Sequence, residues 1–128
     1  MSSDNLLFTK NHEWLENKTD GSAKAGITEY AAQELGDIVY VELPDVGDEF
    51  DAGEAFGNVE SVKAVSPLNM PVSGKIIEVN EELEDSPELV NQSAVEQGWM
   101  VKVEVKDEYQ LKDLMDFPAY QEFLKSQA

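Results

Sequence analysis

The residue with the clearest potential for chemistry is Lys63, the single amine within GNVESVKAVSPLN (57–69). Its neighbours Val62 and Ala64 are small and apolar, and Glu60 is the only other charged residue of the segment. The segment is typical of a hairpin, in which AFGNVESV enters, KAVS turns and PLNMPVSGKIIEV leaves. A lysine at such a tip is accessible to a modifying enzyme or a large partner. An ordinary solvated lysine has the same pattern, so composition alone leaves both interpretations open.

Other residue types offer little chemistry. His12 is the only histidine, which excludes a histidine-rich metal site and leaves a serine triad with a single candidate base. We expect His12 to be a surface or helix-edge residue. The absence of cysteine excludes a thiolate nucleophile and a cysteine-ligated metal. An acidic cluster lacks the ligand spacing of a calcium loop and predicts a solvated turn: Asp48, Glu49, Asp51 and Glu54. We predict no catalytic residues and no metal site.

The charge of the chain limits its partners. A net charge of -18 and a pI near 4.1 oppose binding to nucleic acid or anionic membranes and favour partners with basic faces. All nine basic residues are lysines, so no arginine is present to grip phosphate in a bidentate manner. The chain has neither a basic leader followed by an apolar run nor an apolar stretch of about 18–20 residues. We therefore expect a cytoplasmic protein.

The elements that must position Lys63 are mainly strands. Residues 99–105 alternate apolar and polar side chains, as a strand with one buried face requires, and 37–43 and 75–80 are rich in β-branched residues. Turn signals separate these runs at short intervals, at 44–47, 51–53, 66–67, 71–74 and 97–98. Short strands with tight turns predict an antiparallel β sandwich or flattened barrel.

Helices are expected at three places. Residues 28–36 have Thr28 as N-cap and Gly36 as the C-terminal glycine. The segment 107–126 has apolar residues at helical spacing, and 86–91 is long enough for only a turn or two. With 128 residues, of which 41% are hydrophobic, the chain 1–128 is expected to form one domain.

Several motifs in order give the chain a family resemblance. VESVKAVS (59–66) followed by PVSGKIIEVN (71–80) closely resembles the lipoyl-attachment hairpin of the glycine cleavage system H protein. FTKNHEWLE (8–16) is similar to that family's opening strand, and residues 25–50 are similar to its helix and following strand. Residues 80–105 are similar to its closing section up to the GWM strand. The resemblance covers nearly the whole chain.

The resemblance implies a fold and a cofactor. The fold would be a lipoyl/biotinyl-domain-like antiparallel β sandwich, a barrel-sandwich hybrid, with a short helix in the N-terminal half and C-terminal helices. The hairpin, at about 57–80, would present Lys63 for covalent attachment of lipoic acid through an amide. An amide removes the charge of the lysine and would take the chain from -18 to -19.

The function implied is that of a carrier and not of an enzyme. On a lipoyl arm the chain would receive an aminomethyl group from glycine decarboxylase (P protein), pass it to aminomethyltransferase (T protein) and deliver electrons to dihydrolipoyl dehydrogenase (L protein). A lipoate ligase or an octanoyl or lipoyl transferase would attach the arm. The resemblance thus implies a monomer in the bacterial cytoplasm that serves one-carbon metabolism.

The loaded arm would carry a primary ammonium, which nearby carboxylates would hold by charge-assisted hydrogen bonds. Glu13, in the HEW match, is our first candidate, and Glu34 and Glu60 are further candidates. The fourth position after the lipoyl lysine is often acidic in the family but is Pro67 here. We therefore expect a less acidic or rearranged docking groove.

Two alternatives stay open. Val62 differs from the methionine that precedes the lysine in biotin carriers and from the aspartate typical of 2-oxoacid dehydrogenase lipoyl domains. The same hairpin would, however, suit an H-like protein that relays lipoate to other proteins. An unmodified β-sandwich adaptor is the other alternative, and failure to acylate Lys63 would favour it.

Overall fold

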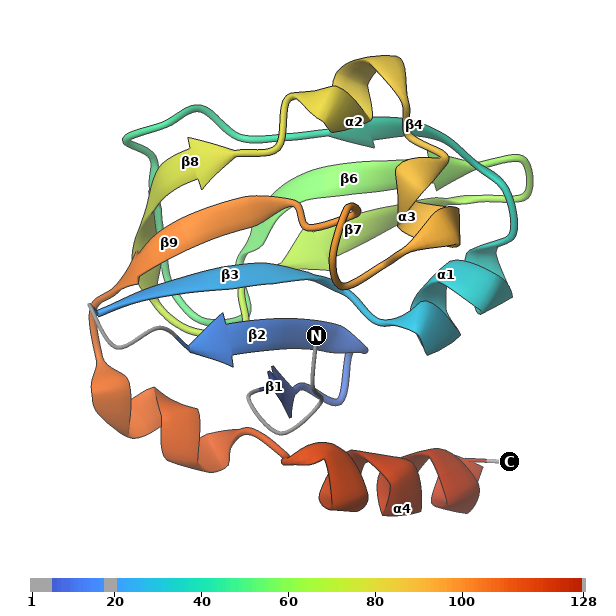
Figure 1. Ribbon diagram of the computed structural model, residues 1–128. Coiled ribbons are helices and arrows are strands. Elements are labelled where there is room, and N and C mark those ends of the chain that lie inside the picture. Colours follow the sequence, from blue (N-terminus) through green and yellow to red (C-terminus); the bar gives the residue numbers. More distant parts are fainter. Residues whose placement is uncertain (1–5, 18–20, 128) are drawn as a thin grey trace.

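Two antiparallel sheets pack against each other in the computed structural model, and the helices lie at their margins (Figure 1). The structure describes residues 6–17 and 21–127. The six-stranded sheet has the order β1-β2-β3-β9-β8-β5, with bounds Leu6–Phe8, Glu13–Asn17, Ser22–Ile27, Val101–Val105, Gly74–Val79 and Glu49–Phe50. The three-stranded sheet has the order β4-β6-β7, with bounds Ile38–Glu42, Ala55–Ser61 and Val65–Asn69. The predicted antiparallel sandwich is confirmed.

The inner faces of the two sheets share one hydrophobic core. Strand β9 contributes Val101 and Val103, both fully buried, so the predicted alternation is confirmed for 101–105. It fails at 99–100, where Met100 is fully buried and Trp99 is only partly buried. The three-stranded sheet contributes Val41, Val59 and Leu68 from β4, β6 and β7. Burial of such side chains contributes roughly 1.5–3 kcal/mol each, so the contact between sheets is a main source of stability.

The hairpin that carries Lys63 is shorter than predicted. Strands β6 and β7 pair from Ala55↔Asn69 to Glu60↔Val65, so the hairpin ends at residue 69 and not at about 80. The chain then crosses to the other sheet, where β8 pairs with β9 and β5. Met70 and Val72 are 2% and 0% exposed. Their burial between the sheets explains why one extended run in the sequence becomes two strands in different sheets.

Pro67 stands in the middle of β7 opposite Asn58. Proline lacks a backbone N–H and is confined to edge strands within sheets. Strand β7 is such an edge, since its only neighbour in the three-stranded sheet is β6. The position of the hairpin at the edge of the sheet is thus compatible with a proline four residues after Lys63.

The first predicted strand is divided in two. Residues 8–16 do not form one strand, because β1 ends at Phe8 and β2 begins at Glu13. The turn between them contains His12, with a positive φ of 65°, and is closed by the Thr9 N–H donating to the Glu13 carbonyl at 2.9 Å. The sequence pattern did not reveal this turn, because no glycine or proline marks it.

Helix α1, Glu29–Leu35, forms at the predicted place. The Thr28 hydroxyl accepts the Ala31 N–H at 3.2 Å, and Gly36 follows the helix with φ 83°. These are the predicted caps. Two single-turn helices, α2 (Glu82–Asp85) and α3 (Leu89–Gln92), precede β9.

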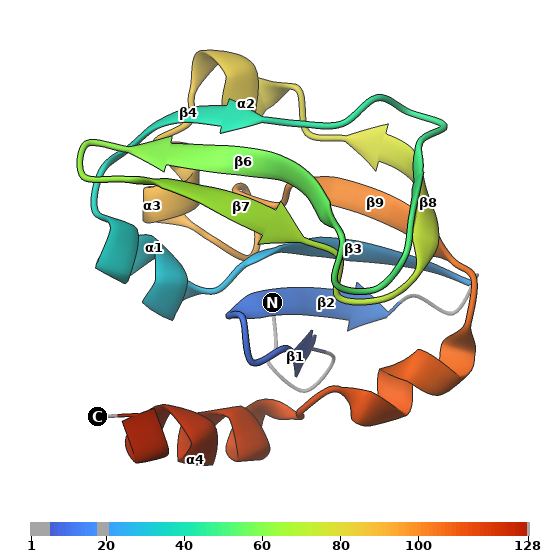
Figure 2. The same ribbon diagram turned by 180° about the vertical axis from the view of Figure 1, so that it is seen from behind.

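The C-terminal helical segment consists of two pieces. A 3-10 helix, η2 (Glu108–Asp113), is followed by α4 (Phe117–Gln127). Between them Met115 exchanges backbone hydrogen bonds with Phe8 at 2.8 and 2.9 Å. Helix α4 lies beneath β1 and β2 (Figures 1 and 2). Within the described residues, no helix is long and apolar enough to cross a membrane.

Candidate functional site

Lys63 stands at the tip of the β6–β7 hairpin and is exposed to solvent. The Ser61 hydroxyl oxygen fixes the backbone of the tip, because it accepts the N–H groups of Lys63 and Ala64, both at 3.1 Å. The Ser61 N–H also donates to the Ala64 carbonyl at 2.8 Å. Within residues 6–17 and 21–127, no ion pair or hydrogen bond involves the Lys63 ammonium. The tip is therefore ordered in its backbone and offers its amine to solvent.

The tip rests on the junction between α1 and β4. The Val62 N–H donates to the Asp37 carbonyl at 3.1 Å, and the Lys63 side chain extends over Gly36. Figures 1 and 2 place the tip at the same end of the molecule as α1 and α3. Contacts between residues 25 to 27 positions apart in the sequence thus fix the place from which the Lys63 side chain extends.

Asn91 of α3 holds this junction from the other side. Its side-chain amide donates to the Gly36 carbonyl at 2.8 Å and accepts the Ile38 N–H at 2.9 Å. One planar amide thereby pairs with the backbone on both sides of Asp37. This role could not be predicted from the sequence, because an exposed asparagine in a short helix carries no periodic signal for a partner 53 residues away.

A cleft of about 300 Å³ lies between α1 and the β6–β7 hairpin. Its lining comes from the turn before β2 with Glu13 and from α1, which we call its two walls, and also from β3, β6 and β7. We call it the helix–hairpin cleft, and its lining residues are Asn11, His12, Glu13, Ile27, Tyr30, Ala31, Glu34, Leu35, Val59, Ser66, Pro67 and Leu68. Leu35 lines the cleft and the next residue, Gly36, faces Lys63, so an extension of the lysine would begin beside the cleft.

Glu13 is the buried acid of this cleft, with 4% of its surface exposed. The Thr9 hydroxyl donates to its Oε1 at 2.6 Å. Desolvation raises the pKa of the Glu13 carboxyl above its ordinary value of 4.5, and hydrogen bonds from Thr9 and from the Asn69 backbone partly offset this effect. A carboxylate in such a place gains by receiving a cation, which would compensate for its lost hydration.

The structure brings two of the three predicted acids together. Glu34, exposed in the last turn of α1, lines the cleft with Glu13, and Tyr30 donates its hydroxyl to Glu34 Oε1 at 3.4 Å. Glu60 does not line it: it is exposed on β6, between Tyr40 and Val65 in register. Side chains alternate along a strand, so Glu60 faces away from its buried neighbour Val59, which lines the cleft. Glu60 therefore lies outside this cleft, and its part in arm docking stays a prediction.

His12 is more than the surface residue that we expected. Its ring is half-buried and lies 4.7 Å from the Tyr30 ring, and its Nδ1 is 2.8 Å from the Tyr120 hydroxyl. It also lines the cleft, next to Glu13. The HEW motif therefore supplies two cleft residues, of which the sequence pattern identified one.

Two other hollows are larger but gather none of the predicted acids. One of about 480 Å³ lies between β1, α4 and the segment 91–96, and one of about 740 Å³ lies over β8 and α2. Among the described residues, no group of three or more histidine, aspartate and glutamate side chains could hold a metal ion. The predicted acidic turn is exposed at Asp48, Glu49, Asp51 and Glu54, and Glu49 forms an ion pair with Lys106.

Comparison with known proteins shows the family to which this chain is similar. A family model described as glycine cleavage H-protein matches residues 6–127. The glycine cleavage system H proteins of Staphylococcus haemolyticus and Staphylococcus saprophyticus are each 58% identical over 120 residues, covering 93% of this chain and 94% of theirs. The crystal structure of a glycine cleavage system H protein from Mycobacterium marinum matches with a TM-score of 0.83 and 34% identity, covering 97% of each chain.

Proposed function

Because the chain belongs to the glycine cleavage H-protein family, we propose that Lys63 is the residue that carries its lipoyl group. The family assigns the chain a lipoyl carrier role in the glycine cleavage system, as a carrier protein and not as an enzyme. The observation that carries the proposal is the position of Lys63. It is the lysine at the tip of a hairpin, its amine is exposed, and it stands beside a cleft that contains two carboxylates.

The residues around Lys63 fit a lipoyl group. When bound, this group supplies a cyclic disulfide that accepts electrons and a one-carbon unit, a capacity that a chain without cysteine does not have. Amide formation requires an amine that an attaching enzyme can reach, and Lys63 offers one without breaking an ion pair. The cleft then offers apolar walls from Ile27, Leu35 and Leu68 to the arm.

The chain itself positions the lipoyl arm and shelters its cargo. Ser61, Asp37 and Asn91 hold the tip against the α1–β4 junction, so the arm starts from a defined place. Glu13 and Glu34 offer negative charge to the primary ammonium of the aminomethyl cargo. Glu13 is the stronger site per contact because it is buried, whereas Glu34 is exposed and its attraction is screened by water and salt.

The partners follow from the family and from the charge. Membership implies partnership with the other components of the glycine cleavage system. In finer detail we propose glycine decarboxylase, aminomethyltransferase and dihydrolipoyl dehydrogenase as the enzymes that visit the arm, and a lipoate ligase or an octanoyl or lipoyl transferase as the enzyme that attaches it. A net charge of -18 favours basic docking faces on all of them. We also propose that the whole chain acts as one carrier domain.

The test is a reconstituted glycine cleavage reaction in which the purified chain is the only carrier. Lys63→Arg keeps the charge but removes the amine that forms the amide, and Lys75→Arg, at an exposed lysine of β8, is the matched control. We expect Lys63→Arg to abolish turnover while its thermal unfolding stays unchanged, and Lys75→Arg to keep both. Turnover by Lys63→Arg would overturn the proposal. A lipoylated wild-type chain that supports no turnover would instead indicate the relay function.

A further inference from the structure

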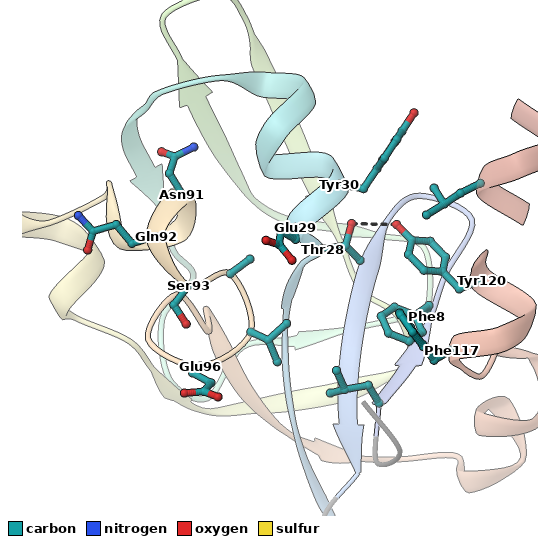
Figure 3. A pocket seen from close by; sticks show the side chains of 14 residues that line it. Phe8, Thr28, Glu29, Tyr30, Asn91, Gln92, Ser93, Glu96, Phe117 and Tyr120 are labelled. Atoms are coloured by element: carbon teal, nitrogen blue, oxygen red, sulfur yellow. Dashed lines mark hydrogen bonds between the residues drawn. The ribbon is translucent and has the colours of Figure 1, made fainter. Parts of the chain in front are cut away.

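Tyr120 is a buried residue of the C-terminal helix α4, with 3% of its surface exposed. Its ring stacks on that of Phe8 in β1, with centroids 4.6 Å apart and planes inclined by 6°. Its hydroxyl is 2.8 Å from His12 Nδ1 and 2.9 Å from Thr28 Oγ1. Figure 3 shows the hydroxyl pointing at Thr28, with the Tyr120 ring beside Phe8 and Phe117.

The two hydrogen-bond partners of Tyr120 belong to two adjacent segments that lead into the helix–hairpin cleft, the turn before β2 and the start of α1. His12 precedes Glu13 in the turn that forms one wall. Thr28 caps α1, the other wall, because its hydroxyl oxygen accepts the N–H of Ala31, a residue that lines the cleft. The Thr28 N–H also donates to the His12 carbonyl at 2.9 Å. The Tyr120 hydroxyl therefore links the turn before β2 to the N-terminus of α1.

We propose that Tyr120 is a positioning residue for the helix–hairpin cleft, and that its hydroxyl holds the two walls at the separation that shelters the arm. A phenol hydroxyl has one proton to donate and lone pairs to accept, so it can bond to both partners at once. Whichever tautomer His12 adopts, Tyr120 is the shared member of the chain of three side chains. The sheltering of the arm rests on the function proposed above.

The surroundings of His12 extend the same link to Tyr30. The imidazole ring lies between Tyr30 of the cleft, at 4.7 Å, and the rings of Tyr120 and Phe123 in α4, both at 5.8 Å. Tyr30 in turn donates to Glu34 at 3.4 Å. Loss of the Tyr120 hydroxyl would thus first make His12 more mobile. Tyr30, which packs on His12, and Glu34, which is bonded to Tyr30, would then be held less firmly.

Tyr120→Phe tests this proposal with little disturbance, because phenylalanine keeps the ring stacked on Phe8 and removes only the hydroxyl. Tyr109→Phe is the matched control, since Tyr109 is 77% exposed in η2. In the chain without lipoate, we expect Tyr120→Phe to speed hydrogen exchange at the Thr28 and Ala31 N–H groups about 3- to 10-fold, the range expected for one net hydrogen bond. Exchange at Ala23, between β2 and β9, should not change.

The second measurement uses the lipoylated protein that carries its one-carbon cargo. We expect Tyr120→Phe to accept lipoate at the wild-type rate, because Lys63 lies at the hairpin tip, yet to lose its one-carbon cargo about 3- to 10-fold faster. Equal exchange at Thr28 and Ala31 in wild type and variant would overturn the proposal. So would a wild-type rate of cargo loss, which would reduce Tyr120 to a stabilising residue. A wild-type chain that takes no lipoate would contradict the proposed function alone, because the exchange measurement does not need the arm.

Discussion

The Lys63 side chain lies over Gly36, with its Cε 3.5 Å from the place where a Cβ of residue 36 would be. That distance is an ordinary van der Waals contact, so a methyl group would fit beside the lysine. The backbone of Gly36 is the stricter constraint, since φ 83° and ψ -155° lie in a region used almost only by glycine. The end of α1 thus depends on glycine for its conformation and not for the space that the lysine occupies.

Gly36→Ala should therefore lower the free energy of unfolding by about 1–3 kcal/mol, the cost of such a backbone conformation in a residue with a Cβ. Urea unfolding of the single variant measures this loss. The same substitution in a Lys63→Ala background separates the cost of the backbone conformation from the effect of the contact with the lysine. We expect the same loss within about 0.5 kcal/mol. A loss that disappears when Lys63 is shortened would mean that the contact matters more than the backbone.

Glu34→Gln should make the loaded protein lose its cargo faster, because Glu34 lines the cleft and offers a charge to the ammonium. An exposed ion pair contributes up to about 1 kcal/mol, so we expect an acceleration of about 2- to 5-fold that shrinks at high salt. The release of formaldehyde and ammonia from the loaded chain measures the rate. Glu60→Gln, outside the cleft, is the matched control and should match wild type. Equal effects of both substitutions would remove Glu34 from the site.

Glu13→Gln should change the pH dependence of stability. Burial raises the pKa of Glu13, so the folded state binds its proton more strongly than the unfolded state does. This contribution is fully present below the ordinary carboxyl pKa and is lost as the pH rises through the raised one. The stability of Glu13→Gln relative to wild type should therefore increase with pH across that window and then level off. Thermal or urea unfolding at a series of pH values would refute this if the difference were constant.

Pro67→Asp should slow the loss of cargo. Pro67 lines the same cleft as Glu13 and offers no charge, and an aspartate there would add a third carboxylate for the ammonium. We expect the rate of formaldehyde release to fall about 2- to 5-fold, as for one partly exposed ion pair. Pro67→Asn, of the same shape but neutral, is the control. If both variants behaved alike, the attraction of the cleft for its cargo would not be electrostatic.

Much of the scaffold could be predicted from local patterns. Val101 and Val103 alternate with polar residues, and Thr28 and Gly36 are the residue types that begin and end a helix, so β9 and α1 were found where they lie. A turn that contains Lys63 was also predicted, although at 63–66, whereas Val65 and Ser66 already belong to β7. These features depend on residues a few positions apart, which is the range that a sequence pattern covers.

The parts that could not be predicted depend on contacts between distant residues. The predicted hairpin is too long because Met70 and Val72 are residue types typical of a strand. That they pass between the sheets follows only from the folded structure. Asn91 meets Gly36 across 55 residues, and His12 meets Tyr120 across 108. Glu60 is close to Lys63 in sequence, but the alternation of β6 turns it away from the cleft. Proximity to Lys63 in the sequence therefore does not predict which acids line the cleft.

The most direct measurement is an intact mass with peptide mapping of the protein purified from cells supplied with lipoate and a lipoylating enzyme. We expect a single lipoyl adduct, found on the peptide that contains Lys63, and no adduct on the Lys63→Arg variant. An unmodified Lys63, or an adduct on another lysine such as the exposed Lys75, would contradict the claim that the hairpin tip is the site of attachment.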